Sequence, residues 1–305
     1  MRSLIKNLFF KDAKIKTFYI TRLLGNQIEE KVVLKNGNQP IDISRSHGMI
    51  CLDPFCVAVW LPERQANAID TQKTEIQFTK GDQLNASIGL ALIEKISTGK
   101  GELLLYKVEK VSNHQLTALH RLVLFGYILR SKKNTYYHRK VVSALYSYPR
   151  NIIIVSYKDD EYYNVFPMDI HAYIPEDNLY ILGLRTTNVT LNKILEAKKV
   201  VVCDTDNIDI NTVYDLGKHS STAPTPLDEL PFDTDESELF SFPIPDFVGS
   251  YKEIEIMHHK KMGYHMLMVG KILNHRMIRQ NPSSLYHISF LQFQKGNYKG
   301  IEGVF

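Results

Sequence analysis

Short strand-like runs separated by turn residues dominate this chain and limit what it can fold into. Residues 47–62 contain a short strand, a turn at Asp53 and Pro54, and the apolar run 55–61, which indicates a buried strand. Residues 152–157 and 161–166 predict a hairpin around the turn 158–160. Many short strands with few helices favour a mainly β protein with helices, and a barrel rather than a doubly wound parallel sheet.

The remaining elements follow the same pattern along the chain. Further strands are predicted at residues 31–34, 101–111, 179–184, 200–203, 253–257 and 265–273, with a last strand pair at 285–293 and from 298 onward. Helices are predicted at 116–129, 139–146 and 189–198, the second ending before Pro149 because the residue before a proline disfavours the helical region. Residues 220–245, rich in Ser, Thr, Pro and acids, predict a loop.

Length and local composition divide the chain in two. A chain of 305 residues is about twice the size of a usual domain, and the polar segment 130–137 lies where the pattern changes. We therefore expect a β-rich N-terminal domain at residues 1–132 and a second domain at 140–305. Residues 101–111 resemble residues 265–275 in outline, a weak repeat signal that would make the N-terminal domain a degenerate barrel related to the second.

Charge and cysteine content narrow the class of protein. The net charge of +4 is too small and scattered to indicate a nucleic-acid binder. Three cysteines, Cys51, Cys56 and Cys203, do not suit a disulfide framework and are normal in a reducing compartment. The start lacks the continuous apolar core of a signal peptide, and no stretch is long and apolar enough to span a bilayer. We expect a cytoplasmic protein with neither nucleic-acid nor membrane partners.

Four segments in the C-terminal part form an ordered series. Asn164 stands in an opening hairpin at residues 148–169, and Thr190 precedes Ile194 by four residues at a helix start. His265 precedes Gly270 by five residues in a late strand, and Tyr298 lies in a closing segment. In this order and spacing the last 160 residues or so resemble the flavin reductase-like proteins, an FMN-binding split β-barrel family.

The resemblance implies both an activity and an assembly. It implies an FMN-binding split barrel at residues 140–305, in which FMN accepts hydride from NADH or NADPH and passes electrons to a flavin, a protein or a small acceptor. It also implies a homodimer with flavin sites near the subunit interface. The alternatives are a non-catalytic FMN-binding electron carrier or sensor module, and a scaffold that has lost the cofactor.

Polar residues around the start of the predicted helix at 189–198 are candidates to bind the flavin phosphate. They are Arg185, Thr186, Thr187, Thr190, Asn192 and Lys193. Arg can grip a phosphate with two parallel hydrogen bonds, and a helix start supplies free N–H groups. The alternative is a helix cap on a solvated loop, since Thr and Asn favour caps for structural reasons.

A second set of residues could contact the flavin ring. Asn164, Pro167 and Met168 could form one wall of an apolar slot, although packing alone explains the last two as well. Further donors could come from the polar stretch His219, Ser220 and Ser221, for which a mobile loop is an equal alternative. His265 is the catalytic candidate, because an imidazole near the ring can donate a hydrogen bond or stabilise charge; the alternative is a satisfied structural histidine.

Other chemistries have weaker signals. His47, Cys51 and Cys56 are close in sequence, but a lone C-x4-C without a second ligand pair does not make a zinc site, and buried structural thiols fit better. The segment Gly99-Lys100-Gly101 lacks the first glycine of a phosphate loop. We therefore expect no metal.

Overall fold

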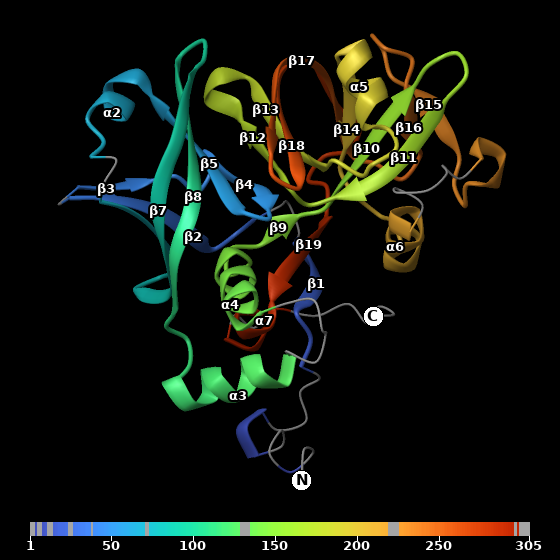
Figure 1. The fold of residues 1–305 in the computed structure, drawn as a ribbon. Coiled ribbons are helices and arrows are strands. Elements are labelled where there is room, and N and C mark those ends of the chain that lie inside the picture. Colours follow the sequence, from blue (N-terminus) through green and yellow to red (C-terminus); the bar gives the residue numbers. More distant parts are fainter. Residues whose placement is uncertain are drawn as a thin grey trace.

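The computed structural model describes residues 4, 8–10, 15–23, 27–37, 39–70, 73–128, 135–218, 226–295 and 298 (Figure 1). The protein is mainly β with helices, as the sequence predicted. Within the described residues, no helix has the length and apolar character needed to cross a bilayer.

The first large sheet comes from the N-terminal part of the chain. Its seven strands are all antiparallel and lie in the order β3-β2-β6-β7-β8-β5-β4. The strands are β2 (Glu30–Asn36), β3 (Gln39–Asp42), β4 (His47–Leu52), β5 (Phe55–Pro62), β6 (Thr74–Lys80), β7 (Gln83–Ser97) and β8 (Gly101–Asn113). The strands predicted at 31–34, 55–61 and 101–111 are confirmed, because their apolar residues alternate into one buried core.

The second large sheet comes from the C-terminal part and has the order β11-β10-β14-β17-β18-β13-β12. Its strands are β10 (Ile153–Lys158), β11 (Tyr163–Met168), β12 (His171–Ile174), β13 (Leu179–Arg185), β14 (Lys199–Cys203), β17 (Ser250–Met262) and β18 (His265–Met277). The predicted hairpin and the predicted strands at 179–184 and 200–203 are confirmed. Both β17 and β18 run well beyond the lengths predicted, since they pair with each other along their whole course.

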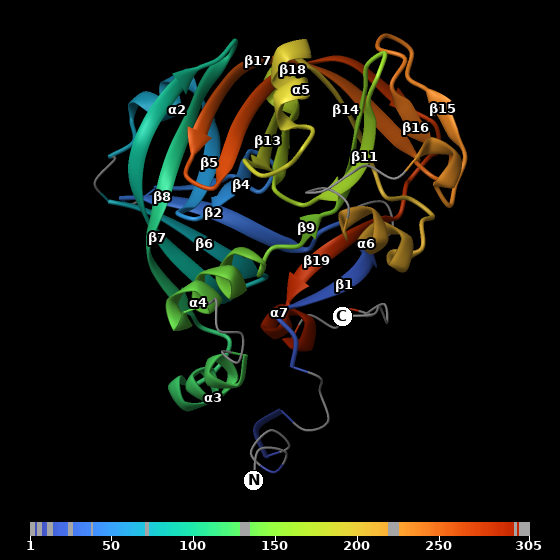
Figure 2. The same cartoon turned by 45° about the vertical axis from the view of Figure 1, so that its right-hand side comes forward.

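The two sheets have the same topology. With the seven strands of each sheet numbered in chain order, both sheets have the spatial order 2-1-5-6-7-4-3. The segments 101–111 and 265–275, which resemble each other in sequence, both lie in the seventh strand. Each sheet is an open, bent half-barrel, and the two lie side by side (Figure 2).

A third, small sheet lies below the other two (Figure 2). It joins β1 (Phe18–Leu23), β19 (Ser284–Ser289) and β9 (Arg150–Asn151), so the N-terminal segment pairs with the C-terminal one. The strand predicted at 285–293 is confirmed up to Ser289 and wrong beyond it, while the strand predicted from 298 onward lies, apart from Tyr298, outside the described residues. Both edges of β19 are already paired, and the chain continues as helix α7 (Phe290–Lys295), whose Phe290 and Leu291 pack in an apolar cluster. The Tyr298 hydroxyl donates to Glu30 at 2.5 Å.

The helices are short and lie outside the large sheets. They are α2 (Glu63–Asn67), α3 (Ala118–Ile128), α4 (Tyr136–Leu145), α5 (Leu191–Ala197), α6 (Ile210–Lys218) and α7. The helices predicted at 116–129, 139–146 and 189–198 correspond to α3, α4 and α5. Helix α4 begins three residues earlier than predicted because the Thr135 hydroxyl caps its start, accepting from His138 N at 3.2 Å. Within the predicted loop 220–245, β15 (Thr234–Glu236) and β16 (Pro243–Pro245) form a two-stranded ribbon.

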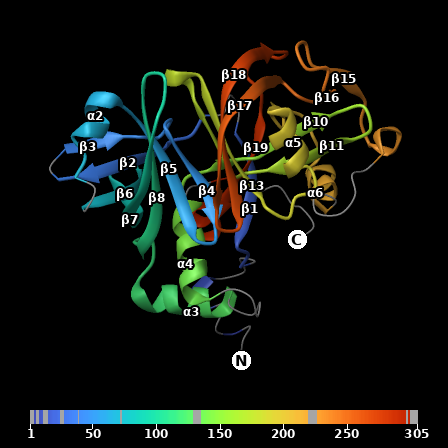
Figure 3. The ribbon, with the colours of Figure 1, turned by 45° about the horizontal axis from the view of Figure 1, so that its top comes forward.

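Three apolar cores hold these layers together. One lies under the N-terminal sheet and includes Val141 and Leu145 of α4, and a second lies under the C-terminal sheet. The third is shared, since Trp60 and Leu105 of the first sheet pack in it with Ile181 of the second. The strands β4, β12 and β13 therefore meet at the seam between the sheets (Figure 3).

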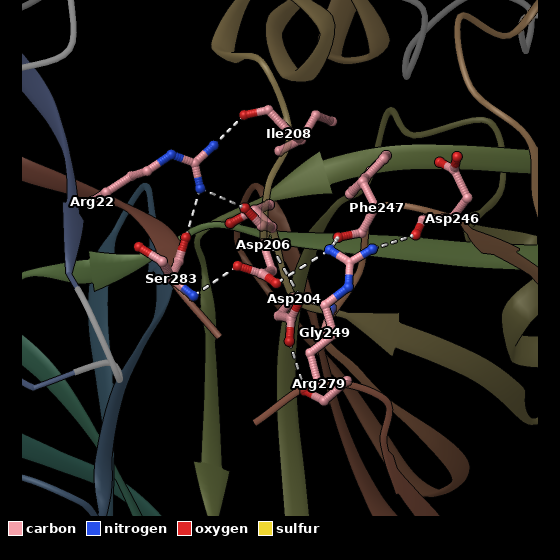
Figure 4. A network of polar contacts seen from close by, with 11 residues as sticks. Arg22, Asp204, Asp206, Ile208, Asp246, Phe247, Gly249, Arg279 and Ser283 are labelled. Atoms are coloured by element: carbon pink, nitrogen blue, oxygen red, sulfur yellow. Dashed lines mark hydrogen bonds and ion pairs between the residues drawn. The ribbon is translucent and has the colours of Figure 1, made fainter. Parts of the chain in front are cut away.

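A polar network anchors the connection between β14 and α6 (Figure 4). Arg22 of β1 donates to Ser283 O at 2.6 Å and also to Ile208 O. Asp206 accepts from Ser283 N at 2.8 Å, and its other oxygen lies 3.4 Å from the Arg279 guanidinium. These contacts tie β1, the segment before β19 and the start of α6 together. They hold the base of a helix that lines the cavity described next.

Candidate functional site

One cavity of about 610 Å³ opens beside the C-terminal sheet where five other segments converge. One wall is strand β11 with Phe166, Pro167 and Met168, and the neighbouring wall is the end of β13 from Gly183 to Arg185. The remaining lining comes from the β1 region, α4, α6, β19 and the end of β4. Its volume is within the range of pockets that bind small molecules and cofactors.

The charged lining of this cavity is mainly positive. Lys16, Arg139 and Arg185 line it, together with three histidines, while Asp169 is the one carboxylate among the described lining residues. Arg185 is exposed at the rim, whereas Arg139 is partly buried and donates to Thr17 Oγ1 at 2.5 Å. Cations of this kind, at the mouth of an apolar slot, favour an anionic ligand.

His265 lies at the start of β18 and is fully buried in the cavity wall. Its Nδ1 is 3.5 Å from Leu52 N, and the N–H of Leu52 is a donor, which favours the tautomer with the proton on Nε2. That Nε2 has no hydrogen-bond partner among the described residues. Burial and the charge of Arg185 lower the pKa of His265 to about 4, so the ring is neutral at pH 7. A neutral ring with a free N–H can donate to a ligand.

Four side chains of the cavity lining form a connected chain. The Tyr214 hydroxyl lies 2.5 Å from His287 Nε2, and His287 Nδ1 lies 2.7 Å from Asp169 Oδ2. The Tyr146 hydroxyl donates to the same Asp169 oxygen at 2.7 Å. All four line the cavity. The order hydroxyl, imidazole, carboxylate is an arrangement along which a proton can move.

The charge state of Asp169 follows from these contacts. Burial alone would raise its pKa, but the hydrogen bond and charge of His287 and the hydrogen bond from Tyr146 lower it to about 2. Asp169 is therefore ionised at neutral pH and holds the His287 ring in one orientation.

Four of the residues predicted from the sequence lie in the cavity. They are Pro167, Met168, Arg185 and His265. Asn188, in the polar segment between β13 and α5, lies in it as well. The structure thus brings together the predicted catalytic histidine, the predicted apolar wall and the predicted arginine.

Asn164 and Thr190 are not among the lining residues, and they contact each other instead. Asn164 Nδ2 donates to Thr190 Oγ1 at 2.8 Å, and the Tyr162 hydroxyl lies 2.9 Å from the same oxygen. Both side chains are buried. Their spacing in the sequence reflects a contact that fixes the β11 strand to the start of α5.

The other predicted phosphate-site residues lie around that helix start, outside the cavity lining. Lys193 pairs with Asp159 at 2.7 Å and lies over the Tyr162 ring, and Asn192 and Thr187 are exposed. The Thr186 hydroxyl donates to Tyr264 O at 3.3 Å. The predicted His219, Ser220 and Ser221 lie outside the described residues, and their role stays a prediction.

Residues from distant segments were not predicted from the sequence. Lys16, Arg139, Tyr214 and His287 line the cavity, yet they stand 22 to 249 positions apart from its predicted residues in the chain. None of them lies in a motif. Only Asp169, next to the predicted Met168, was within reach of a sequence argument.

The cysteines are buried free thiols. Cys51 and Cys56 face each other on β4 and β5, and Cys51 Sγ lies 3.5 Å from His265 Nδ1. Burial raises the pKa of Cys56 to about 12. Within the part of the chain that the structure describes, no group of three or more His, Cys, Asp or Glu side chains is placed to hold a metal ion.

No family model and no curated protein matches the sequence. Among solved structures, the chain is similar to an FMN-binding protein from Thermus thermophilus with bound 1-cyclohex-2-enone, at 20% identity over 52% of this chain and 90% of that one, TM-score 0.41. It is also similar to the NADH:FAD oxidoreductase SgcE6 of Streptomyces globisporus, at 11% identity over 54% and 93% of the two chains, TM-score 0.44. The flavin reductase PheA2 matches at 13% identity over 54% and 98%, TM-score 0.41.

Proposed function

We propose that this chain binds FMN in the cavity beside the C-terminal sheet and works as an NADH- or NADPH-dependent flavin oxidoreductase. The observation that carries the proposal is the composition of the cavity, which has an apolar wall at one end, three fixed cations and a buried imidazole nitrogen without a partner. The electron acceptor is a flavin, a protein or a small molecule.

The residues present fit the two ends of the cofactor. Arg185, Lys16 and Arg139 would hold the phosphate, because guanidinium and ammonium groups bind phosphate oxygens through charge-assisted hydrogen bonds. Pro167, Met168 and Leu184 offer an apolar surface for the ring. When bound, FMN supplies the redox chemistry, accepting a hydride and passing on electrons.

His265 and the hydrogen-bonded series Tyr214, His287 and Asp169 would supply the polar contacts around the flavin ring. The His265 ring is neutral at pH 7, and its Nε2–H, which has no partner among the described residues, would donate to an acceptor on the edge of the flavin ring. The Tyr214 hydroxyl, backed by His287 and the ionised Asp169, would hold a proton beside the cavity and could exchange it with a bound molecule.

One preparation tests the proposal. Purified protein reconstituted with FMN is expected to be yellow and to lose its flavin absorbance anaerobically on addition of NADH or NADPH. A yellow protein that neither nucleotide bleaches would support an electron carrier or sensor instead. A colourless protein that takes up no added FMN would rule out both.

A further inference from the structure

The two halves of the chain contact each other reciprocally. The hairpin tip between β17 and β18 reaches the N-terminal half, where Tyr264 N donates to Asp53 O at 2.9 Å. The tip between β7 and β8 reaches the C-terminal half in the same way, where Lys100 N donates to Asp177 Oδ2 at 3.1 Å. Each half thus presents the same element to the other, which is the pattern of a two-fold symmetric dimer interface.

The pairing registers show which residues are equivalent. The pairing of β7 with β8 shifts register at two bulges, Gly89/Leu90 and Leu92/Glu94. The pairing of β17 with β18 shifts register at the matching places, Glu253/Ile254 and Ile256/His258. Counted along the strands from these bulges, Gly101 stands where the other half has His265. Gly101 pairs with Pro62, and His265 pairs with Arg185, so Pro62 stands where the other half has Arg185.

A backbone contact in each half supports the same assignment. Gly183 N donates to Ile170 O at 2.8 Å, and Trp60 N donates to Ser46 O at 2.7 Å. Trp60 therefore stands where the other half has Gly183.

A second cavity, of about 620 Å³, lies at the place equivalent to the first. It is lined by Ile41, Asp42, Ser46, Trp60, Leu61 and Pro62, which correspond to Phe166, Pro167, Ile170, Gly183, Leu184 and Arg185 of the first cavity. The opposite half contributes Glu176 here, from the 3-10 helix directly after its third strand, as the N-terminal half contributes Leu52 to the first cavity. The fold has thus formed the same pocket twice.

The second cavity has lost the groups that fit FMN. Pro62 replaces Arg185 and Gly101 replaces His265, so the rim guanidinium and the buried imidazole are both missing. The glycine-lined surface at Gly183 is replaced by the Trp60 indole, whose Nε1 donates to Thr98 Oγ1 at 3.1 Å and to Asp177 Oδ2 at 3.2 Å. Among the described residues that line the second cavity, the two carboxylates Asp42 and Glu176 outnumber the one cation, Arg45.

We propose that the N-terminal half takes the place of a second subunit. It closes the cavity of the C-terminal half with β4 and α4, while its own equivalent cavity does not take flavin. One chain then binds one FMN as a monomer, in place of the homodimer that the family resemblance implied. This inference rests on the proposed function, since it concerns how many of the two equivalent cavities hold the cofactor.

Two measurements on the full chain test it. Titration of FMN into the apoprotein is expected to saturate at one FMN per chain, and light scattering of the holoprotein at a mass near 35.1 kDa. Arg185→Ala is expected to weaken FMN binding at least tenfold. Arg45→Ala, the matched change at the second cavity, is expected to leave the affinity within twofold.

The outcomes separate this inference from the function it rests on. Two FMN per chain, or one per two chains, would overturn the inference and leave flavin binding intact. Loss of FMN binding in Arg45→Ala would also overturn it. A holoprotein that is a dimer and releases FMN when it is diluted to monomers would show that a second chain is needed. No binding of FMN at all would remove the proposed function itself.

Discussion

The N-terminal and C-terminal halves share one sheet topology but differ in what is inserted between the strands. In the N-terminal half, β5 leads directly into α2, and a two-residue turn joins β6 to β7. In the C-terminal half, residues 186–190 precede α5, and residues 204–249 separate β14 from β17. Asn188, Tyr214 and Gly217 reach the cavity from these insertions. The strands supply the walls together with Arg185 and His265, and the insertions add Asn188, Tyr214 and Gly217.

Some positions have kept the same role in both halves. His47 and His171 lie at equivalent places at the start of the third strand; His47 is buried and His171 is partly buried. His47 Nδ1 lies 2.8 Å from Ile43 O, and His171 Nε2 lies 2.9 Å from Asn151 O. These two histidines are part of the structure that both halves share, whereas His265 and Gly101 occupy equivalent positions at which the two halves differ.

The largest expected effect comes from Trp60, which lines the second cavity and packs in the core shared by the two sheets. Trp60→Ala removes a side chain that is only 4% exposed, and the void and lost hydrogen bonds should lower the free energy of unfolding by about 3–5 kcal/mol. Urea denaturation would measure this, and FMN affinity of the folded variant should stay within about threefold of the parent. A loss below about 1 kcal/mol would mean that Trp60 does not hold the seam.

A large effect on turnover is expected from Tyr214, which has no counterpart in the N-terminal half. Tyr214→Phe removes the hydroxyl that contacts His287, and loss of a positioned proton donor should lower kcat about 100-fold. The FMN dissociation constant should change little, because packing of the ring is kept. If steady-state rates with NADH and NADPH match those of the parent, the chain from Tyr214 to Asp169 is structural only.

Replacement of Arg185 should distinguish the binding of the FMN phosphate from the binding of the rest of the cofactor. Hydrogen bonds to charged groups contribute about 1.5–3 kcal/mol, so Arg185→Ala should weaken FMN by about 10–100-fold and riboflavin by about threefold or less. Fluorescence titrations with both ligands would measure the two affinities. Equal losses for FMN and riboflavin would place the phosphate elsewhere, for instance beside Lys193.

The smallest expected effect of a single variant is on the pH dependence of stability, through His47 and His171. Burial, with smaller effects of neighbouring groups, lowers the pKa of His47 to about 3 and that of His171 to about 4. Below the ordinary histidine pKa of about 6.5 the unfolded chain therefore binds more protons than the folded one, and stability falls as pH drops from about 6.5 towards 4. Each ring should contribute about 1.4 kcal/mol per pH unit in that window.

His47→Gln and His171→Gln test this pH dependence in the two halves. Each should reduce the slope of unfolding free energy between pH 6 and pH 5 by about 1.4 kcal/mol per pH unit, relative to the parent. The two variants should behave alike, since their rings occupy equivalent sites. A reduced slope in only one of them would show that the two halves do not share this part of the structure.

Local pattern was enough to predict many of the elements, although β1, β6, β7, β12 and α6 were not predicted. The hairpin at β10 and β11, the strands β5, β8, β13 and β14, and the helices α3 to α5 follow from alternation, turn residues and caps in short windows. The helix after Ser289 was not predicted, because the end of β19 is set by its pairing with β1 and β9 and not by its own sequence pattern. That pairing joins residues more than 260 positions apart, which no local pattern records.

The site was predicted less completely, for a related reason. Pro167, Met168, Arg185 and His265 lie in segments with a recognisable order, and the cavity brings them together. Asn164 and Thr190 have the expected spacing but are occupied with each other. A sequence pattern records that two residues are constrained, and it does not say whether a ligand or a neighbour satisfies them.

By itself, the sequence determined the elements, the mainly β class and the repeat between residues 101–111 and 265–275, because propensity, alternation and similarity act over neighbouring residues. Only the tertiary structure decided that the two halves face each other as one symmetric pair, and that one of two equivalent cavities carries Arg185 and His265 while the other carries Pro62 and Gly101. The physical reason is that a cavity is made where strands and chain ends meet. Its charge and shape depend on contacts between segments that the chain keeps far apart.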